Sequence, residues 1–424
     1  MKLIYCLTTV FCFFSSTLVF SGEGNKCTTM KILEERIKKD PSLKLRMEES
    51  EIQTQQRILK RSKNPTIHQT ISIPIVVHVI WHDPSENISL EQIQSQIDIL
   101  NKDFQLKNSD TLTSSHPFHE FVGNANIEFC LANKDPEGKA TDGITRTYTD
   151  SVSFSGNGTE KKSSSGGQDN WNPTKYMNLW VCNISGSKDG GGTLGYATFP
   201  SDLASNPGED GVVISTKAFG TLGTATAPNN LGRTGTHEVG HWLNLRHIWG
   251  DNQPDCGDDF VADTKPSDSM NYGCPTFPHK PNNKCGTDAN GEMYMNYMDY
   301  VDDACMNMFT KGQVVRMLDA INGERVGLLT SAGCSGTSGV NEELAENSVE
   351  VYPNPNNSTF TVNFNNSHYK TITIFDVFGK KVLNLYNVSG NSAQINLPEV
   401  RSGVYYIQIN SSNSMITKKV FIAK

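Results

Sequence analysis

Hydrophobic residues before residue 335 predict a mixture of strands and helices. Residues 73–81 form an almost continuous apolar run, which predicts a buried strand. Ile93, Ile97 and Leu100 recur at helical spacing after Ser89, a candidate N-cap, so a helix is expected there. Further strands are expected at 126–131, 178–184, 193–199 and 211–215, and a long helix at 230–244. This pattern indicates an α/β (α+β) domain.

The pattern changes after residue 334. Residues 335–344 begin with Ser-Gly-Thr-Ser-Gly, which is typical of a flexible linker. Residues 345–424 then contain short alternating runs separated by turn residues, which predict a small β-sandwich. These runs lie at 360–364, 372–375, 404–409 and 420–422. This part has seven Lys and Arg against four Asp and Glu, whereas the whole chain has a net charge of -8.

The N-terminus has the pattern of an export signal followed by a pro-segment. Residues 1–21 combine Lys2 with a long apolar run, and cleavage is expected near Ser21 or Gly22. A retained anchor is the alternative, but no basic stop-transfer cluster follows the run. Residues 22–61 are charged and helical in character without a core of their own, so they are expected to be a pro-segment. Lys60-Arg61 is a candidate site for maturation cleavage.

Composition agrees with an exported protein. Charged residues make up only 19% of the chain, and no basic patch indicates binding to nucleic acid. Beyond the signal, no stretch is long and apolar enough to span a bilayer, so the mature chain is expected to lack an anchor. Eight cysteines follow the signal, and export favours disulfides. They are Cys27, Cys130, Cys182, Cys256, Cys274, Cys285, Cys305 and Cys334.

Three histidines within eleven residues form a candidate zinc site. His237 and His241 lie four apart on the expected helix, so their imidazoles share one face, with Glu238 beside them as a candidate base. His247 can join them only if the chain leaves the helix and turns back. Asn244 is suited to that turn because Asn tolerates left-handed backbone angles. Three neutral imidazoles with one open position are typical of catalytic zinc.

These residues carry a resemblance to a known family. HEVGHWLNLRH resembles the HExxHxxGxxH motif of metzincin metalloproteases, with Asn244 in place of Gly, and its surroundings are similar to the pappalysin family. Met295-Asn296-Tyr297-Met298-Asp299-Tyr300 resembles the clan's Met-turn, with Met298 as the turn methionine. The resemblance implies a metzincin-like catalytic domain over 62–334, with a twisted mixed sheet, and a role for Tyr300 in holding the transition state. Without the histidine motif, ordinary core packing would explain Met298 and Tyr300.

The resemblance has implications for the cysteines. Spacing leaves three pairings open for the four cysteines that bracket the segment between the histidine motif and the Met-turn. The resemblance implies the crossed pairing, Cys256 with Cys285 and Cys274 with Cys305. Cys27 is expected to act as a latency switch whose thiolate fills the open zinc position; the alternatives are an ordinary disulfide or an unpaired thiol. The partners of Cys130, Cys182 and Cys334 remain open.

An acidic loop and one further aspartate have implied roles as well. The loop after the histidines resembles a calcium-binding loop of pappalysin relatives, which implies Asp259 and Thr264 as Ca²⁺ ligands with Asp263 nearby; a solvated acidic loop is the alternative. The resemblance also puts Asp303 at the bottom of the pocket for the residue just after the scissile bond. A carboxylate there would select Arg or Lys. An acid at a helix start is the alternative.

Residues 345–424 carry a second resemblance. Val351-Tyr352-Pro353-Asn354-Pro355, Phe378-Gly379-Lys380 and Ser402-Gly403-Val404-Tyr405 resemble the C-terminal sorting domain of the type IX secretion system of the Bacteroidetes. This implies export through the type IX machinery, followed by release or attachment at the cell surface. A carbohydrate-binding or adhesive β-domain is the alternative.

The sequence therefore predicts a secreted zinc endopeptidase that acts on proteins or peptides outside the cell or at its surface. His237, His241 and His247 would hold Zn²⁺, and Glu238 would take a proton from a water at the metal. Two alternatives remain: a non-catalytic surface adhesin with a structural histidine cluster, and a zinc peptidase of another clan in which a downstream Glu is the third ligand.

Overall fold

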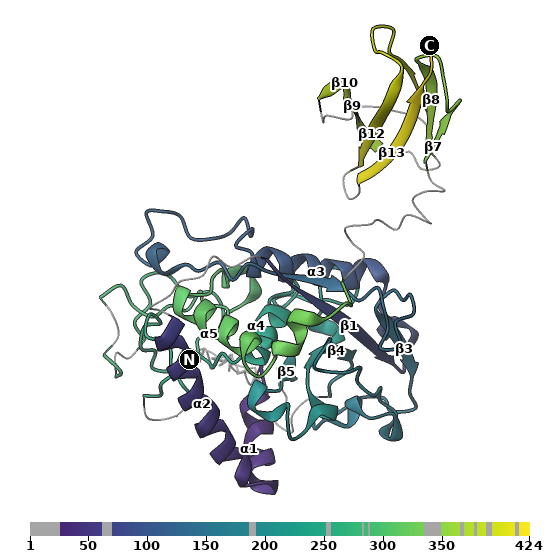
Figure 1. Ribbon diagram of the computed structural model, residues 1–424. Coiled ribbons are helices and arrows are strands. Elements are labelled where there is room, and N and C mark those ends of the chain that lie inside the picture. Colours follow the sequence, from purple (N-terminus) through teal and green to yellow (C-terminus); the bar gives the residue numbers. More distant parts are fainter. Residues whose placement is uncertain are drawn as a thin grey trace, which may run out of the picture. The chain divides into compact units, whose positions relative to one another are not determined.

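The computed structural model divides into two compact units, Met1–Cys334 and Ser335–Lys424 (Figure 1). It describes residues 26–61, 70–185, 192–251, 256–281, 284–286, 289–334, 349–364, 369–376, 380–386, 392–411 and 415–424. The expected signal at 1–21 and linker at 335–344 lie outside the described residues. Among the described helices, none has the length and apolar character needed to cross a bilayer.

A six-stranded mixed sheet forms the centre of the first unit. Its strand order is β2-β1-β4-β6-β5, with β3 also paired to β1, and β5 is antiparallel to β6 while the other pairs are parallel. Strand β1 is buried over eight consecutive residues, as its apolar run predicts. The strands are β1 Ile71–Trp81, β2 Ile127–Leu131, β3 Ile144–Tyr148, β4 Met177–Cys182, β5 Gly195–Ala197 and β6 Val212–Ser215.

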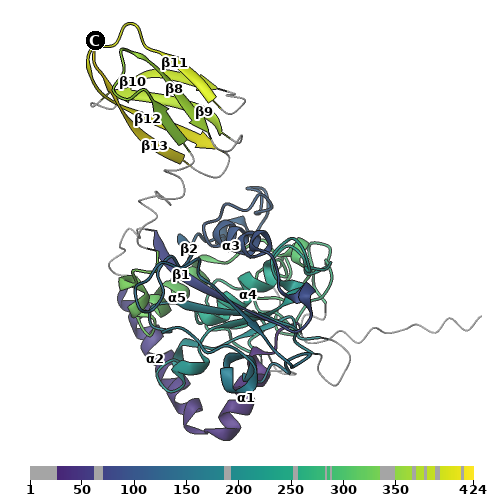
Figure 2. The same cartoon turned by 90° about the vertical axis from the view of Figure 1, so that its right-hand side faces the viewer.

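Three helices of this unit pack close to the sheet (Figure 2). They are α3 Leu90–Phe104, α4 Arg233–Trp242 and α5 Lys311–Asn322. Helix α3 begins as expected, because the Ser89 side chain accepts a hydrogen bond from the backbone of Gln92. Helix α4 is shorter than the predicted 230–244. Gly232 before it has φ of 77°, and the next residues beyond Trp242 leave helical geometry.

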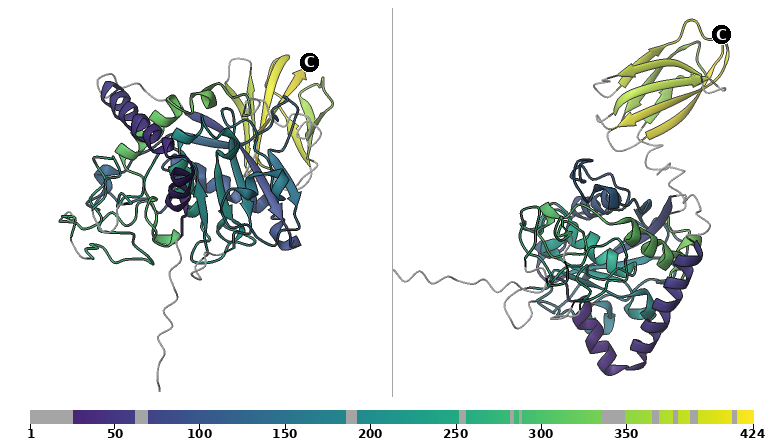
Figure 3. Two further views of the ribbon diagram at one scale, coloured as in Figure 1. Left: turned by 90° about the horizontal axis from the view of Figure 1, so that it is seen from below. Right: turned by 90° about the vertical axis from the view of Figure 1, so that its left-hand side faces the viewer.

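The expected pro-segment forms two helices at the periphery of this unit, α1 Thr29–Lys39 and α2 Ser42–Arg61 (Figure 3). Ion pairs attach both helices to the catalytic part: Arg36 pairs with Asp202 and Glu209, and Arg57 pairs with Asp319 and Glu324. Short 3-10 helices complete the unit at Pro84–Glu86, His119–Phe121, Thr159–Lys161, Ser163–Ser165, Pro200–Asp202, Pro207–Glu209, Thr216–Ala218, Asp303–Cys305 and Val326–Thr330.

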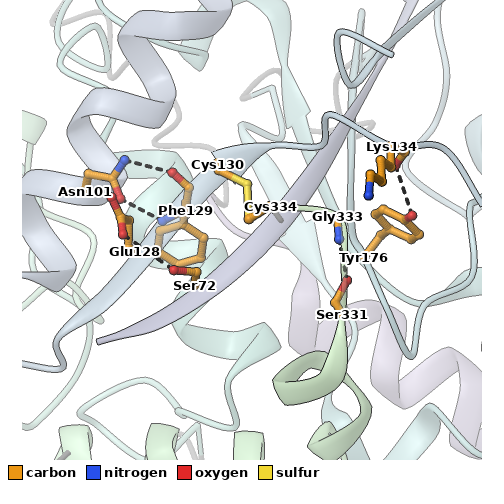
Figure 4. Close-up of a disulfide and its surroundings, with 10 residues drawn as sticks. All are labelled: Ser72, Asn101, Glu128, Phe129, Cys130, Lys134, Tyr176, Ser331, Gly333 and Cys334. Atoms are coloured by element: carbon orange, nitrogen blue, oxygen red, sulfur yellow. Dashed lines mark hydrogen bonds between the residues drawn. A yellow bond between two sulfur atoms is a disulfide. The ribbon is translucent and has the colours of Figure 1, made fainter. Parts of the chain in front are cut away.

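Three disulfides are present in the described part of the chain. Cys256 pairs with Cys285 and Cys274 with Cys305, which is the crossed arrangement expected from the resemblance. A third disulfide joins Cys130 on β2 to Cys334, at the end of the unit (Figure 4). Cys27 and Cys182 are buried free thiols. Cys27 is therefore available to bind a metal.

The second unit consists of two antiparallel sheets, as the alternating runs predict. Their orders are β10-β9-β12-β13 and β11-β8-β7. Phe360, Val362, Ile374, Ile407 and Ile409 are buried in one shared core. The strands are β7 Val349–Tyr352, β8 Thr359–Phe364, β9 Tyr369–Asp376, β10 Lys381–Tyr386, β11 Ser392–Asn396, β12 Gly403–Ser411 and β13 Met415–Ile422.

Candidate metal centre

Three imidazole nitrogens converge at one point beneath the sheet. The Nε2 atom of His241 lies 3.2 Å from that of His237 and 3.1 Å from that of His247, and the remaining pair is 3.3 Å apart. All three rings are buried. The third group at this point is the imidazole of His247, as the eleven-residue motif predicts. A downstream glutamate was the alternative third ligand.

The other nitrogen of each ring, Nδ1, faces an oxygen atom. Nδ1 of His237 bonds to the carbonyl oxygen of Tyr297 at 2.7 Å, and Nδ1 of His241 bonds to that of Leu245 at 2.8 Å. Nδ1 of His247 faces Oδ1 of Asp251 at 2.5 Å. Carbonyl and carboxylate oxygens only accept, so Nδ1 donates in every case. In the neutral form of each ring, Nε2 then has a lone pair that faces the other two rings.

Lone pairs at this separation fit a shared cation. Four ligands placed tetrahedrally about 2.0–2.1 Å from zinc lie roughly 3.3 Å from one another, which is close to the spacing seen here. The thiol of Cys27 belongs to the same group, whose ligand atoms all lie within 4.8 Å of one another. Burial lowers the pKa of His237 to about 3 and that of His241 well below its usual value, so both rings are neutral and able to bind a metal.

The turn that brings His247 to the centre depends on one residue. Asn244 has φ of 74°, in the left-handed region that Asn tolerates better than other non-glycine residues. The amide of Leu245 donates to the carbonyl oxygen of Gly240 at 2.9 Å and closes the turn. The departure from Gly at position 244 therefore leaves the required backbone geometry intact.

The expected Met-turn lies against the helix that carries the histidines. A Cβ atom added to Gly240 would be 2.5 Å from the sulfur of Met298. Only glycine at position 240 therefore lets the Met298 side chain lie this close to the helix. The amide of Ile248 donates to the carbonyl oxygen of Met298 at 3.4 Å. Met298 is fully buried against this helix.

Glu238 lies beside the three imidazoles in a fully buried position. Its Oε2 accepts from the Thr29 hydroxyl at 3.2 Å and faces the Cys27 thiol at 3.5 Å. Oε1 is buried without a hydrogen-bond partner. Burial raises the pKa of Glu238 to about 8, although the bonds from Cys27 and Thr29 act in the opposite direction.

Tyr300 borders the centre on the side of Cys27. Its ring centroid lies 4.9 Å from that of His247 and 5.7 Å from that of His237. The hydroxyl donates to the carbonyl oxygen of Cys27 at 3.1 Å. Burial raises the pKa of Tyr300 well above its usual value, so the hydroxyl stays protonated and remains a donor.

A pocket opens beside His237 and Glu238. Lys26, Leu194, Thr234, Asp303 and Met306 are among its lining residues. The carboxylate of Asp303 lines the pocket while its Oδ2 accepts from the backbone of Leu231 and Arg233, at 2.8 and 3.2 Å. Asp303 therefore holds the backbone just before α4 and lies beside the pocket, and its role in specificity stays a prediction.

The comparisons with known proteins agree with this geometry. Residues 160–322 match the peptidase family described as pregnancy-associated plasma protein-A. A structure of mirolysin is 48% identical over 62% of this chain and 97% of that chain, with a TM-score of 0.58. The chain belongs to the pappalysin family of metallopeptidases. A mutant promirolysin of Tannerella forsythia is 43% identical over 72% of this pappalysin and 97% of that chain, with a TM-score of 0.64.

Curated relatives point the same way over a shorter region. Extracellular metalloprotease 1 of Coccidioides posadasii is 40% identical over 32% of this chain and 47% of its own length, so the pappalysin spans about half of such relatives. Residues 350–423 match a secretion system C-terminal sorting domain. The protein is therefore secreted or displayed at the cell surface.

The expected calcium ligands are only partly brought together. Thr264 donates to Oδ1 of Asp259 at 2.9 Å, and Oδ2 of Asp259 is buried without a hydrogen-bond partner. Burial raises the pKa of Asp259 to about 7. Asp263 instead accepts from Thr310 and Gly312, at 2.6 and 2.8 Å, and so holds the first turn of α5.

Several residues of this pappalysin's site were not expected from the sequence. Thr29 binds Glu238, and Asp251 orients His247. Arg316 donates to the carbonyl oxygen of Asn244 at 2.6 Å. Asp251 lies only four residues beyond His247, so a search for a carboxylate that orients the third imidazole could have found it. Thr29 and Arg316 have no such local signal.

Proposed function

We propose that this pappalysin is a secreted zinc endopeptidase that is made in a latent form. The observation that carries the proposal is the convergence of three imidazole lone pairs next to a buried carboxylate, that of Glu238. Zinc, when bound, would polarise the scissile carbonyl and make a water more acidic. His237, His241 and His247 would hold it, each fixed by its Nδ1 hydrogen bond.

Glu238 is the proposed general base. Once Glu238 is ionised, its Oε1, which has no hydrogen-bond partner, would take a proton from water and then deliver it to the leaving amine. Tyr300 is the proposed second donor to the scissile carbonyl oxygen. Its hydroxyl already donates to a peptide carbonyl, that of Cys27, and would donate to the substrate once the pro-segment leaves.

The pro-segment supports the proposal of latency. The Cys27 thiol lies within 4.8 Å of the three histidine nitrogens, where it would fill the open position of the metal centre, and Cys27 forms an isolated parallel bridge with Gly195 of β5. Residues before and after Cys27 are also held here: the Lys26 carbonyl oxygen accepts from the backbone of Leu194 at 2.9 Å, and the hydroxyl of Thr29, two residues after Cys27, donates to Glu238. The thiol and its flanking residues would exclude both water and substrate.

Further parts of the proposal concern specificity and accessory sites. Asp303 would favour Arg or Lys just after the scissile bond, because its buried carboxylate lines the pocket next to Glu238. Asp259 and Thr264, with Asp263 nearby, would form a Ca²⁺ site; the unpartnered Oδ2 of Asp259 supports it. The C-terminal unit would be recognised by the type IX secretion machinery. A solved mature mirolysin of Tannerella forsythia contains a cleaved peptide, which agrees with a peptide substrate here.

The test is cleavage of a peptide library by the activated enzyme, with and without a zinc chelator. We expect chelation to abolish cleavage and zinc to restore it. Glu238→Ala should keep the metal and lose activity by at least about a hundredfold, whereas Glu128→Ala, an exposed position on β2, should not. Chelator-resistant cleavage, or undiminished turnover in Glu238→Ala, would refute the proposed mechanism.

A further inference from the structure

The indole of Trp249 contacts two groups of the metal centre at once. Its ring lies almost parallel to the imidazole of His247, with 6° between the planes and 4.3 Å between the centroids. The same indole meets the ring of Tyr300 in a T-shaped contact, at 4.9 Å and 78°. Trp249 is buried, so both contacts are shielded from solvent. One side chain therefore touches both the third imidazole and the proposed second donor.

A tight turn places the indole on the imidazole. The amide of Gly250 donates to the carbonyl oxygen of His247 at 2.9 Å, so the chain turns back directly after the third histidine. Gly250 has φ of 71°, and a Cβ atom added there would lie 2.2 Å from the amide nitrogen of Asp258. Only glycine fits this position. The local backbone thus sets the contact between Trp249 and His247.

The third imidazole needs this support more than the other two. Helix α4 fixes the backbone of His237 and His241, whereas His247 lies beyond the end of that helix. The contact between Nδ1 of His247 and Asp251 fixes one direction of the ring but lets the ring tilt about that contact. A flat aromatic partner against one face removes this freedom. Trp249 therefore sets the plane in which the Nε2 lone pair of His247 points.

Tyr300 would depend on the same indole in the active enzyme. Its hydroxyl donates to the carbonyl oxygen of Cys27, and this hydrogen bond would be lost when the proposed pro-segment leaves. Of the aromatic contacts of Tyr300, those with Trp249 and His247 are the closest, both at 4.9 Å. The contact with Tyr272 is longer, at 6.0 Å. The rings of Trp249, His247 and Tyr300 would thus hold one another in place.

We propose that Trp249 is a positioning residue, which holds His247 in the plane needed to bind zinc and Tyr300 where it donates to the scissile carbonyl oxygen. This inference rests on the proposed function. Trp249 acts on the metal through His247 and on the transition state through Tyr300. Loss of the indole should therefore weaken zinc binding and lower kcat, while KM stays unchanged, because Tyr300 acts in the transition state.

The first test is the zinc affinity of the activated enzyme, measured by competition with a chromogenic chelator. Trp249→Leu should raise the zinc dissociation constant by about tenfold, as expected when a group that orients a metal ligand is lost. Trp249→Phe keeps a smaller ring and should raise it only about threefold. Trp180→Leu is the matched control, since Trp180 is another buried indole, 5.1 Å from the ring of His78. It should lower stability and leave zinc affinity unchanged.

The second test is peptide cleavage at saturating zinc. Trp249→Leu should lower kcat by about tenfold with KM unchanged, and Trp180→Leu should change neither. In a Tyr300→Phe background the same leucine substitution should add little to the loss of kcat, because the hydroxyl that Trp249 positions is already gone. If Trp249→Leu does not fold, the same comparisons are made with Trp249→Phe.

Each outcome decides the inference. If the Trp249 variants change only the free energy of unfolding, as Trp180→Leu does, Trp249 is an ordinary core residue and the inference is wrong. Equal losses of kcat with and without the Tyr300 hydroxyl would also overturn it, because Trp249 would then not act through that group. A wild-type enzyme that binds no zinc would overturn the proposed function itself, and this inference with it.

Discussion

The guanidinium of Arg316 donates from Nε to the carbonyl oxygen of Asn244, at the turn between the second and third imidazoles. Arg325 does the same for the carbonyl oxygen of Trp242, the last residue of α4, at 2.8 Å. Two buried arginines thus satisfy carbonyl groups that the end of a helix leaves without partners. Their counter-ions differ: Arg325 pairs with Asp210, just before β6, whereas Arg316 pairs with Glu51 of α2.

The Glu51–Arg316 pair predicts that α2 contributes to latency. Glu51→Gln removes the charge that meets both terminal nitrogens of Arg316, and we expect it to weaken docking of the pro-segment by about 2 kcal/mol. The variant should therefore mature faster after secretion, as followed by gel electrophoresis over time. Glu49→Gln, an exposed change on the same helix, is the control. Equal maturation rates for the two variants would contradict this role.

The Asp210–Arg325 pair predicts a large effect on stability. Asp210 accepts from both terminal nitrogens of Arg325 at 2.8–2.9 Å and from the Trp242 indole at 3.1 Å, all in buried surroundings. Asp210→Asn would leave the guanidinium without its counter-charge, so we expect a loss of roughly 3–5 kcal/mol in the free energy of unfolding. Denaturant titration measures this loss. A change below about 1 kcal/mol would show that the pair is dispensable.

Replacing Cys27 and replacing Cys182 should affect the latency of the precursor differently. Cys27→Ser replaces the soft sulfur ligand of the metal centre with a much weaker one, so the unprocessed chain should cleave a small peptide without prior maturation. Cys182→Ala alters the other buried thiol, on β4, and should leave the precursor latent. The measurement is activity of the intact precursor, verified by mass spectrometry. Latency that survives in Cys27→Ser would rule out the thiol as the switch.

The buried ring of His78 should make the free energy of unfolding depend on pH. Burial lowers the pKa of this ring on β1 to about 4, and its nitrogens face Asn178 and Thr145 at 3.0 and 2.8 Å. The unfolded chain binds the proton at about pH 6.5 and the folded chain only near pH 4, so stability falls as pH drops through this interval. The contribution is about 3 kcal/mol.

His78→Gln isolates this contribution because it keeps a polar side chain without a titrating group. The difference in unfolding free energy between wild type and variant should shrink between pH 7 and pH 4, as measured by chemical denaturation at each pH. A difference that is independent of pH would show that the ring does not titrate as described.

The sequence predicted the metal centre because its geometry is local. Four-residue spacing on one helix and a left-handed angle at Asn244 are sufficient to bring His237, His241 and His247 together. The buried strand β1 was equally clear from its apolar run. Strand β3 was missed: its sequence, Ile-Thr-Arg-Thr-Tyr, lies on a partly exposed edge and gives little hydrophobic signal.

Long-range contacts could not be predicted in the same way. Arg316 is 72 residues from Asn244, and Tyr300 is 273 residues from Cys27. No spacing in the sequence relates such pairs, because folding of the whole sheet brings them together. The length of α4 was overestimated for another reason: a left-handed glycine, Gly232, delays its start, and hydrophobic periodicity does not register backbone angles.

The most direct test of the central claim is the zinc content of purified wild type, Glu238→Gln and His247→Asn, measured by elemental analysis after removal of loosely bound metal. We predict one zinc per chain in the wild type and in Glu238→Gln, and its loss in His247→Asn. A wild-type protein without zinc, or a His247→Asn variant that retains a full equivalent, would contradict the account.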